Sequence, residues 1–295
     1  MISPRERKPD WLKVIAPGGA EYTRVKSTLS SLKLHTVCQE AHCPNVGECW
    51  GQGTATVMLL GDICTRGCRF CAVHKGHPAA VDPTEPESVA RGVRELGLKY
   101  VVLTMVNRDD LPDGGAAHVA DTVRRLHELS PELLVEALVG DFQGDEPRID
   151  TVLQSRPDVF AHNVEVVRRI TLHVRDIRCT YERSLDVLRY AKKAAPDRFV
   201  KSSVMVGAGE TDAEVGETLR DLRDAGVDIV TLGQYLRPSE KHLEVDRYVE
   251  PSRFAAWKEL ALGMGFEFAA SGPLVRSSYR AAEAFVRARG REAGR

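Results

Sequence analysis

Six of the seven cysteines lie between Cys38 and Cys71, and this clustering constrains the chain more than any other feature. They form two triplets of different spacing, and the seventh, Cys179, has no companion motif. The first residues contain no apolar stretch like a secretory signal. An odd number of cysteines in such a chain favours metal or redox chemistry over a disulfide framework.

The second triplet has the spacing Cys-x3-Cys-x2-Cys and consists of Cys64, Cys68 and Cys71. Three thiolates on one tight loop can bind three irons of a four-iron cluster and leave the fourth iron open for a substrate. Zinc is the alternative, because thiolates also bind zinc and four histidines lie nearby in the sequence, His35, His42, His74 and His77. Structural zinc prefers four ligands, commonly in Cys-x2-Cys pairs, and this triplet has one such pair. The pattern therefore favours an iron-sulfur cluster.

The first triplet, Cys38, Cys43 and Cys49, has the spacing Cys-x4-Cys-x5-Cys and lies in an N-terminal segment without a strand-helix rhythm. A second four-iron cluster here would again lack one cysteine ligand. We expect its fourth ligand to be a residue other than cysteine.

From Thr54 onward, β-branched runs alternate with amphipathic stretches, which predicts a parallel sheet with helical crossovers. The expected strands are Thr56–Gly61, Lys99–Met105, Leu133–Val139, Asp158–Asn163, Phe199–Val206 and Asp228–Gln234. The expected helices are Glu21–Leu32, Pro86–Leu96, Ala116–Leu129, Ser184–Ala194, Asp212–Ala225 and Ser252–Gly263. Six strand-helix units fit a partial barrel, but periodicity alone does not separate it from an open doubly wound sheet.

The Cys64 triplet follows the first predicted strand, at the edge where parallel α/β folds carry their chemistry. Its spacing resembles that of the radical S-adenosylmethionine superfamily. The resemblance implies a partial (β/α)6 barrel with N-terminal and C-terminal extensions, and an α/β fold class overall. It also implies that the open iron binds S-adenosylmethionine, whose cleavage yields a 5′-deoxyadenosyl radical.

With both triplets in this order, the chain resembles the lipoyl synthase family from about Trp11 to Ala281. The resemblance rests also on further motifs: Arg108-Asp-Asp-Leu-Pro-Asp-Gly-Gly115, Asp141-Phe-Gln-Gly-Asp145, Pro157-Asp-Val-Phe-Ala-His-Asn-Val-Glu165, Tyr181-Glu-Arg-Ser-Leu185, Gly207-Ala-Gly-Glu-Thr211, Gly233-Gln-Tyr-Leu236 and Ser271-Gly-Pro-Leu-Val-Arg-Ser-Ser-Tyr279. It implies insertion of two sulfur atoms, at C6 and C8, into an octanoyl chain held on a carrier lysine. Another sulfur-inserting radical enzyme, or a non-catalytic zinc or iron-sulfur protein, is the alternative.

The resemblance also implies a set of ligands and two [4Fe-4S] clusters. Cys38, Cys43 and Cys49 match the ligands of an auxiliary cluster that supplies the sulfur, and Cys64, Cys68 and Cys71 match those of the cluster that binds S-adenosylmethionine. Ser278 matches the fourth ligand of the auxiliary cluster. An alkoxide is a harder ligand than a thiolate and should leave iron more readily, particularly beside a basic neighbour such as Arg276.

Weaker assignments concern contacts with S-adenosylmethionine. Asn163 and Glu165 at the end of the fourth strand, Lys201 at the start of the fifth and Arg108 after the second are the candidates. Three places depart from the family pattern: Asn107 where aspartate is common, Gly140 where proline is common, and Arg175–Cys179, where a proline usually follows the arginine.

Composition and the family resemblance together predict the location, the domains and the partners of the protein. Net charge is −1 and no apolar run approaches the length of a membrane span, so we expect a cytoplasmic protein that binds neither nucleic acid nor membrane. The expected domains are an N-terminal extension (1–53), the barrel (54–236) and a C-terminal extension with a basic tail (237–295). The implied partners are octanoylated lipoyl carrier domains (2-oxoacid dehydrogenase E2 subunits and the glycine cleavage H protein), an electron donor such as flavodoxin or ferredoxin, and an iron-sulfur carrier.

Overall fold

The computed structural model describes residues 8–14, 18–32, 34–40, 43, 45–51 and 56–278. Tyr279 and the basic tail lie outside the described residues. Among the helices that are described, none has the length and hydrophobicity needed to span a lipid bilayer.

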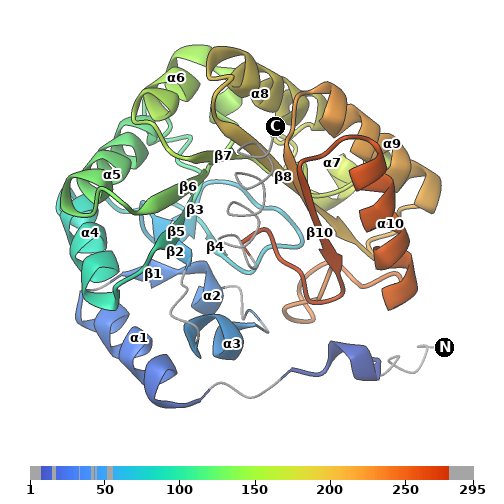
Figure 1. Ribbon diagram of the computed structural model, residues 1–295, viewed down its shortest axis with the longest axis horizontal. Helices are drawn as coiled ribbons and strands as arrows, with labels where there is room; N and C mark the ends of the chain where they lie inside the picture. The colour runs from blue at the N-terminus through green and yellow to red at the C-terminus, as the bar shows by residue number, and fades with distance from the viewer. Residues whose placement is uncertain are drawn as a thin grey trace.

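One eight-stranded sheet organises the described residues, and its strands are adjacent in the order β1-β2-β5-β6-β7-β8-β9-β10. Every neighbouring pair from β2 to β10 is parallel, whereas β1 pairs with β2 antiparallel. The strands are β1 (His35–Thr36), β2 (Thr56–Leu59), β5 (Tyr100–Met105), β6 (Leu134–Leu138), β7 (Val159–Ala161), β8 (Phe199–Val206), β9 (Ile229–Gln234) and β10 (Phe268–Gly272). A doubly wound sheet reverses its strand order at a switch point, and this sheet does not. The curved sheet with helices around its outer side confirms the partial barrel (Figure 1).

Apart from α6, the helices that cover the sheet begin and end close to the expected positions. They are α4 (Glu85–Leu96), α5 (Ala116–Leu129), α6 (Glu146–Gln154), α8 (Tyr181–Ala194), α9 (Asp212–Asp224) and α10 (Pro251–Gly263). Local interactions explain where individual helices begin or end. Thr211 and Glu214 form a reciprocal capping box at the start of α9. Gly97 ends α4 in the left-handed region, with φ 63°, where glycine has no steric penalty. Helix α6 was not expected; it is short and buries only Ile149, Val152 and Leu153.

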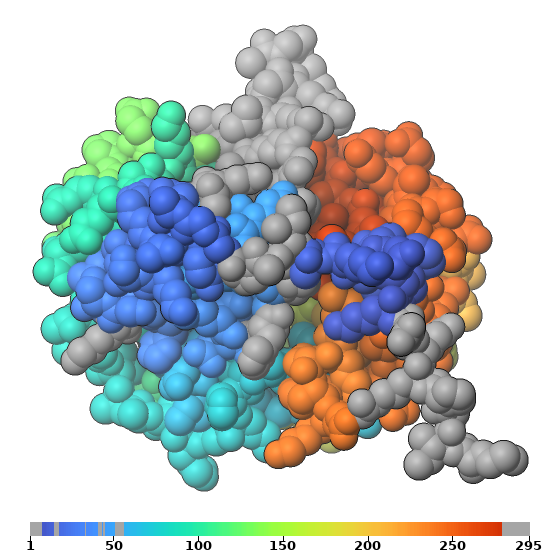
Figure 2. Space-filling model, turned by 90° about the horizontal axis from the view of Figure 1, so that it is seen from below, coloured from blue at the N-terminus to red at the C-terminus, as the bar shows by residue number. Residues whose placement is uncertain are grey.

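The N-terminal extension packs across the start of the barrel. It comprises η1 (Asp10–Leu12), α1 (Ala20–Ser31), β1, α2 (Val37–Glu40) and α3 (Val46–Gly51). The Trp50 ring is fully buried and stacks on Tyr22, with ring centroids 5.1 Å apart. The side-chain amide of Asn45 donates a hydrogen bond of 2.6 Å to the carbonyl of Leu274. Figure 2, which views the molecule from below, shows the blue extension facing the viewer, with one part against the cyan-to-green start of the barrel and another over its orange-red end. The extension therefore connects the two ends of the curved sheet.

The C-terminal extension contributes a strand of its own to this sheet. Strand β10, which was not expected, pairs in parallel with β9 over five residues, from Phe268 opposite Ile229 to Gly272 opposite Gly233. The loop after β10 brings Ser278 back toward the N-terminal extension. The sheet thus continues beyond residue 236.

Candidate iron-sulfur sites

Cys64, Cys68 and Cys71 lie on one loop at the carboxyl ends of the parallel strands. The loop follows β2 and contains two short paired strands, β3 (Ile63–Cys64) and β4 (His74–Lys75). Its start is fixed to the segment after β5, because Thr65 donates its backbone N–H to the carbonyl of Asn107 at 3.0 Å. All three cysteines therefore lie at the edge of the sheet where parallel α/β folds place their catalytic residues.

Backbone donors point at two of these sulfurs. The N–H groups of Asn107 and Arg66 approach Sγ of Cys64 at 3.3 and 3.4 Å, and the N–H of Asp176 approaches Sγ of Cys68 at 3.3 Å. Such donors stabilise iron-bound thiolates and suit a cluster held here. Burial raises the pKa of Cys71 to about 11. Iron binding at that thiol must therefore displace a proton.

Arg66, inside the cysteine motif, fixes the loop to two neighbouring strand ends. Its guanidinium forms ion pairs with Asp109 at 2.8 Å and Asp141 at 2.7 Å, and its side chain is 2% exposed. The Nη1 atom also donates to Sγ of Cys179 at 3.2 Å. Neither Arg66 nor Cys179 was among the expected site residues, since the strands that bring them together are far apart in the sequence.

Asn163 and Glu165 lie together just after β7. The Asn163 amide donates to the Glu165 carboxylate at 3.1 Å. Glu165 adopts φ 67°, an uncommon conformation for a residue other than glycine, and its negative charge acts on the thiol of Cys71. Burial raises the pKa of Glu165. The structure thus brings these two predicted residues to the cysteine loop.

Lys201 does not join this group. Its ammonium lies 2.8 Å from both carboxylate oxygens of Glu136, and the carboxylate also accepts from the Tyr100 hydroxyl at 2.8 Å. All three side chains are buried, near the amino ends of the strands and away from the cysteine loop. Lys201 is thus ion-paired with Glu136 inside the barrel, and its role as a cofactor contact stays a prediction.

Arg108 is buried in the loop after β5 and supports the backbone. It pairs with Asp110 at 2.8 Å and donates to the carbonyl of Ala79 at 3.0 Å. Its side chain is thus engaged with the protein itself, and the structure gives it no contact with the cysteines.

A second group of predicted residues converges between the N-terminal and C-terminal extensions. A small cavity there is lined by Cys38, Cys43, Asn45, Val46, Cys49, Thr56, Arg276 and Ser278. Cys38 lies in α2, Cys49 in α3 and Cys43 between these helices in the sequence, whereas Arg276 and Ser278 follow β10. All four expected ligands of the second cluster therefore border one space.

The surroundings of this cavity fit an anionic, sulfur-rich group. The Nε1 atom of fully buried Trp50 has no hydrogen-bond partner in the part of the chain that the structure describes. Burial raises the pKa of the Cys38 thiol, and the nearby indole of Trp50 acts in the opposite direction. Burial lowers the pKa of Arg276, and a negative charge on Cys43 opposes that change. A buried N–H and a desolvated guanidinium both gain from a negative charge placed between them.

Within the described ranges, no three His, Cys, Asp or Glu side chains converge closely enough to hold a single metal ion. A four-iron cluster is larger, so its ligands need not converge on one point.

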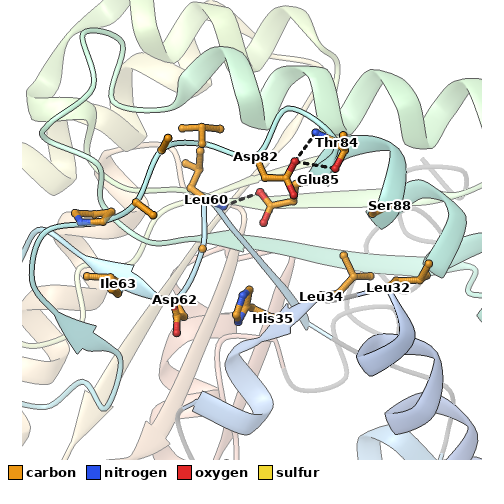
Figure 3. A pocket seen from close by; sticks show the side chains of 15 residues that line it. Leu32, Leu34, His35, Leu60, Asp62, Ile63, Asp82, Thr84, Glu85 and Ser88 are labelled. Carbon is orange, nitrogen blue, oxygen red and sulfur yellow. Dashed lines mark hydrogen bonds between the residues drawn. The ribbon is translucent and has the colours of Figure 1, made fainter.

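A larger cavity lies elsewhere, between the N-terminal extension and the start of α4 (Figure 3). It measures about 280 Å³ and is lined by Leu32, Leu34, His35, residues 60–63, residues 78–82, Thr84, Glu85 and Ser88. Two of its carboxylates are engaged, Asp82 with Thr84 and Glu85 with the backbone N–H of Leu60. None of the cysteines lines it.

Comparison with known proteins defines the class first. The model of the radical SAM superfamily matches residues 58–233. Solved structures agree in fold: methylornithine synthase aligns with a TM-score of 0.55 at 14% identity over 85% of this chain and 82% of that one. The hydrogenase maturase HydG from Carboxydothermus hydrogenoformans aligns with a TM-score of 0.56 at 12% identity over 78% and 65%. The fold and the cysteine loop are those of a radical S-adenosylmethionine enzyme.

The family within this class follows from the N-terminal segment and from curated relatives. A model described as the N-terminal domain of lipoyl synthase matches residues 2–43. Lipoyl synthase of Sorangium cellulosum is 65% identical over 95% of this chain and 79% of its own, and that of an Anaeromyxobacter species is 60% identical over 95% and 96%. The lipoyl synthase of Thermus thermophilus is 56% identical over 95% and 87%. The chain belongs to the lipoyl synthase family of radical sulfurtransferases.

Proposed function

We propose that this enzyme inserts two sulfur atoms, at C6 and C8, into an octanoyl group held on a lysine of a carrier domain. We further propose that the sulfur comes from an auxiliary four-iron cluster held by Cys38, Cys43, Cys49 and Ser278. The observation that supports this most directly is the cavity that these four residues share, between segments from opposite ends of the chain.

When bound, the two clusters and S-adenosylmethionine supply an electron, a carbon-centred radical and the transferred sulfur. In the proposal, Cys64, Cys68 and Cys71 hold three irons of the radical-generating cluster. Backbone N–H groups of Arg66, Asn107 and Asp176 stabilise two of those thiolates. Asn163 and Glu165, beside Cys71, are placed to bind the polar groups of S-adenosylmethionine.

The residues around the second cavity have different tasks. The indole N–H of Trp50 lies near Cys38, and Arg276 lies next to Cys43 and two residues from Ser278. With a cluster bound, the three thiolates and Ser278 would hold its irons, and the Arg276 guanidinium would stabilise the serine oxygen as an anion.

The proposed substrates and partners follow from the family. The carrier is an octanoylated lipoyl domain of a 2-oxoacid dehydrogenase E2 subunit or the glycine cleavage H protein. Electrons come from a small donor such as flavodoxin or ferredoxin, and an iron-sulfur carrier restores the auxiliary cluster.

The test is anaerobic incubation with dithionite, S-adenosylmethionine and an octanoyl-lysine peptide, with mass spectrometry for 6- and 8-thiolated peptide. The purified protein should contain about eight irons and matching sulfide, as two four-iron clusters require. Cys43→Ala should still form 5′-deoxyadenosine but no thiolated peptide, whereas Cys68→Ala should form neither. Thiolation by Cys43→Ala at the normal rate would contradict the assignment of the sulfur donor.

A further inference from the structure

One side of the cysteine loop packs against residues 174–178, which follow β7 in the sequence. Arg69, inside the cysteine motif, donates its N–H to the carbonyl of Val174 at 2.8 Å. Gly67 donates its N–H to the Asp176 carboxylate at 2.8 Å. Segments that are more than a hundred residues apart in the sequence thus run side by side and form one continuous piece of surface.

This surface lies directly over Cys68. The N–H of Asp176 approaches Sγ of Cys68 at 3.3 Å, and the side chain of the next residue, Ile177, is 79% exposed. A molecule that touches Ile177 is therefore separated from a proposed iron ligand by a single residue. Electron tunnelling falls off steeply with distance, so a protein that passes electrons to the Cys64 loop must dock at a surface this close to it.

The centre of the surface is apolar. Among the described residues four large hydrophobic side chains are exposed, and the two that are most exposed, Ile177 and Leu172, lie here, whereas Val14 and Leu260 lie elsewhere. Exposed apolar side chains that gather in one place mark a protein interaction site.

Two cations lie beside these apolar side chains. The Arg69 guanidinium contacts the ring of His173 at 3.0 Å and its carbonyl at 3.1 Å. The Lys75 ammonium lies against the loop, because a Cβ added at Gly67 would be 3.0 Å from it. Neither Arg69 nor Lys75 forms an ion pair with a carboxylate of the described residues. We call Arg69, Lys75, Leu172, His173 and Ile177 the loop surface.

The charged groups around the loop surface are balanced. Arg178 pairs with Asp176 at 2.8 Å, and Arg237 pairs with Glu244 at 3.4 Å. These four side chains add no net charge, so the two unpaired cations make the loop surface positive. An acidic partner is attracted to such a surface, and the attraction weakens as salt is added.

We propose that the loop surface is the docking site of an acidic one-electron donor protein that carries a flavin or an iron-sulfur group. This inference rests on the proposed function, because it takes Cys68 as an iron ligand of the radical-generating site. In the step that it serves, the donor loses one electron and the site held by the three cysteines gains it, with no bond made or broken. Electron-transfer complexes are small and transient, which suits two apolar side chains flanked by two cations. A carrier domain fits less well, because none of these residues lines the cavity of the proposed sulfur donor.

The test uses the whole, anaerobically purified protein and a bacterial flavodoxin. Calorimetric titration with oxidised flavodoxin gives the Kd, and reduced flavodoxin at a concentration below the Kd drives formation of 5′-deoxyadenosine. Ile177→Glu and Lys75→Glu should each raise the Kd roughly fivefold or more and slow the flavodoxin-driven reaction by a similar factor. With dithionite, which needs no docking site, both variants should form 5′-deoxyadenosine at close to the original rate.

Leu260→Glu and Lys193→Glu are the matched controls, because they make the same changes on exposed side chains of the outer helices α10 and α8 (Figure 1). Both should keep the original Kd.

An unchanged Kd in both Ile177→Glu and Lys75→Glu would overturn the inference. Weaker binding of an octanoylated carrier domain with unchanged binding of flavodoxin would also overturn it. So would loss of the dithionite-driven reaction in both variants, since the surface would then support the loop itself. If the original protein formed no 5′-deoxyadenosine with dithionite, the proposed function would be wrong, and the Kd values would still decide whether flavodoxin docks here.

Discussion

At the scale of single residues, the two sites differ in how their ligands are held. Two of the Cys64 loop thiols accept backbone N–H groups, whereas the cavity around Cys38 is lined by a desolvated guanidinium and a serine. The first arrangement suits a cluster that stays intact. The second suits one whose ligands must change during turnover.

Ser278→Cys tests that difference directly. A thiolate binds iron more firmly than an alkoxide, so this variant should keep about eight irons and still cleave S-adenosylmethionine, yet form at least tenfold less thiolated peptide. Ser277→Ala is the neighbouring control and should have a milder effect, because Ser277 does not line the cavity. Normal thiolation by Ser278→Cys would mean that release of this ligand does not limit the reaction.

His162 makes stability depend on pH. Its ring is buried between the carbonyl of Val139 and the hydroxyl of Ser184, and burial lowers its pKa from 6.5 to about 4. The unfolded chain therefore binds a proton below pH 6.5 that the folded chain does not bind until about pH 4, so stability falls as pH falls through this window. The loss should be on the order of 2–3 kcal/mol.

The measurement is urea unfolding at pH 7.5 and pH 5, followed by circular dichroism under anaerobic conditions. His162→Gln should be less stable at pH 7.5 but lose less stability on acidification than the original protein. Parallel pH dependence in both proteins would show that other groups are responsible.

At the scale of elements, the parallel strands are buried on both faces, which is why their continuous apolar runs could be found in the sequence. All six residues of β9 are buried, and its predicted range differs from the observed one by a single residue. Strand β10, Phe268-Ala-Ala-Ser-Gly272, has few β-branched or aromatic residues, so nothing local predicts a strand. It forms because β9 offers an unpaired edge.

Inside the barrel, β8 and β6 are joined by the buried ion pair of Lys201 and Glu136. Lys201→Met should lower the free energy of unfolding by about 3–5 kcal/mol, because it leaves a buried carboxylate without its cation. The double variant Lys201→Met with Glu136→Leu should recover most of the loss. Urea unfolding measures both. A Lys201→Met protein of normal stability that no longer binds S-adenosylmethionine would support Lys201 as a cofactor contact.

Residues of the site could be predicted from the sequence chiefly where they belong to a recognisable motif. The cysteines and Ser278 were assigned in this way, and two departures from the family pattern, Asn107 and Gly140, were noted. The structure shows that the departures are coupled, because a Cβ added at Gly140 would lie 2.4 Å from Oδ1 of Asn107. Contacts of this kind, like that of Arg66 with Cys179, depend on the three-dimensional position of separate loops.

At the scale of the whole molecule, the extensions meet where the barrel opens. The hydrogen bond from Asn45 to Leu274 joins the cysteine segment to the loop that carries Ser278. Asn45 is buried, so the bond is shielded from water. Relative placement of the four proposed ligands depends on this contact.

Asn45→Ala should therefore weaken the second site and leave the first intact. Iron content should fall from about eight toward about four, while formation of 5′-deoxyadenosine persists and thiolated peptide is lost. Iron and sulfide analysis with the peptide assay would show this. Loss of both activities together would mean that the contact supports the whole fold.

The same contact spans 229 positions of the sequence, and this sets an order of events during synthesis. A ribosome has made the Cys64 loop and the strands around it long before it reaches Ser278. In the proposed assignment, Cys38, Cys43 and Cys49 lack their fourth ligand until then. A chain cut short after β9 would keep the Cys64 loop but not the complete proposed second site, so that site can form only after translation has passed residue 278.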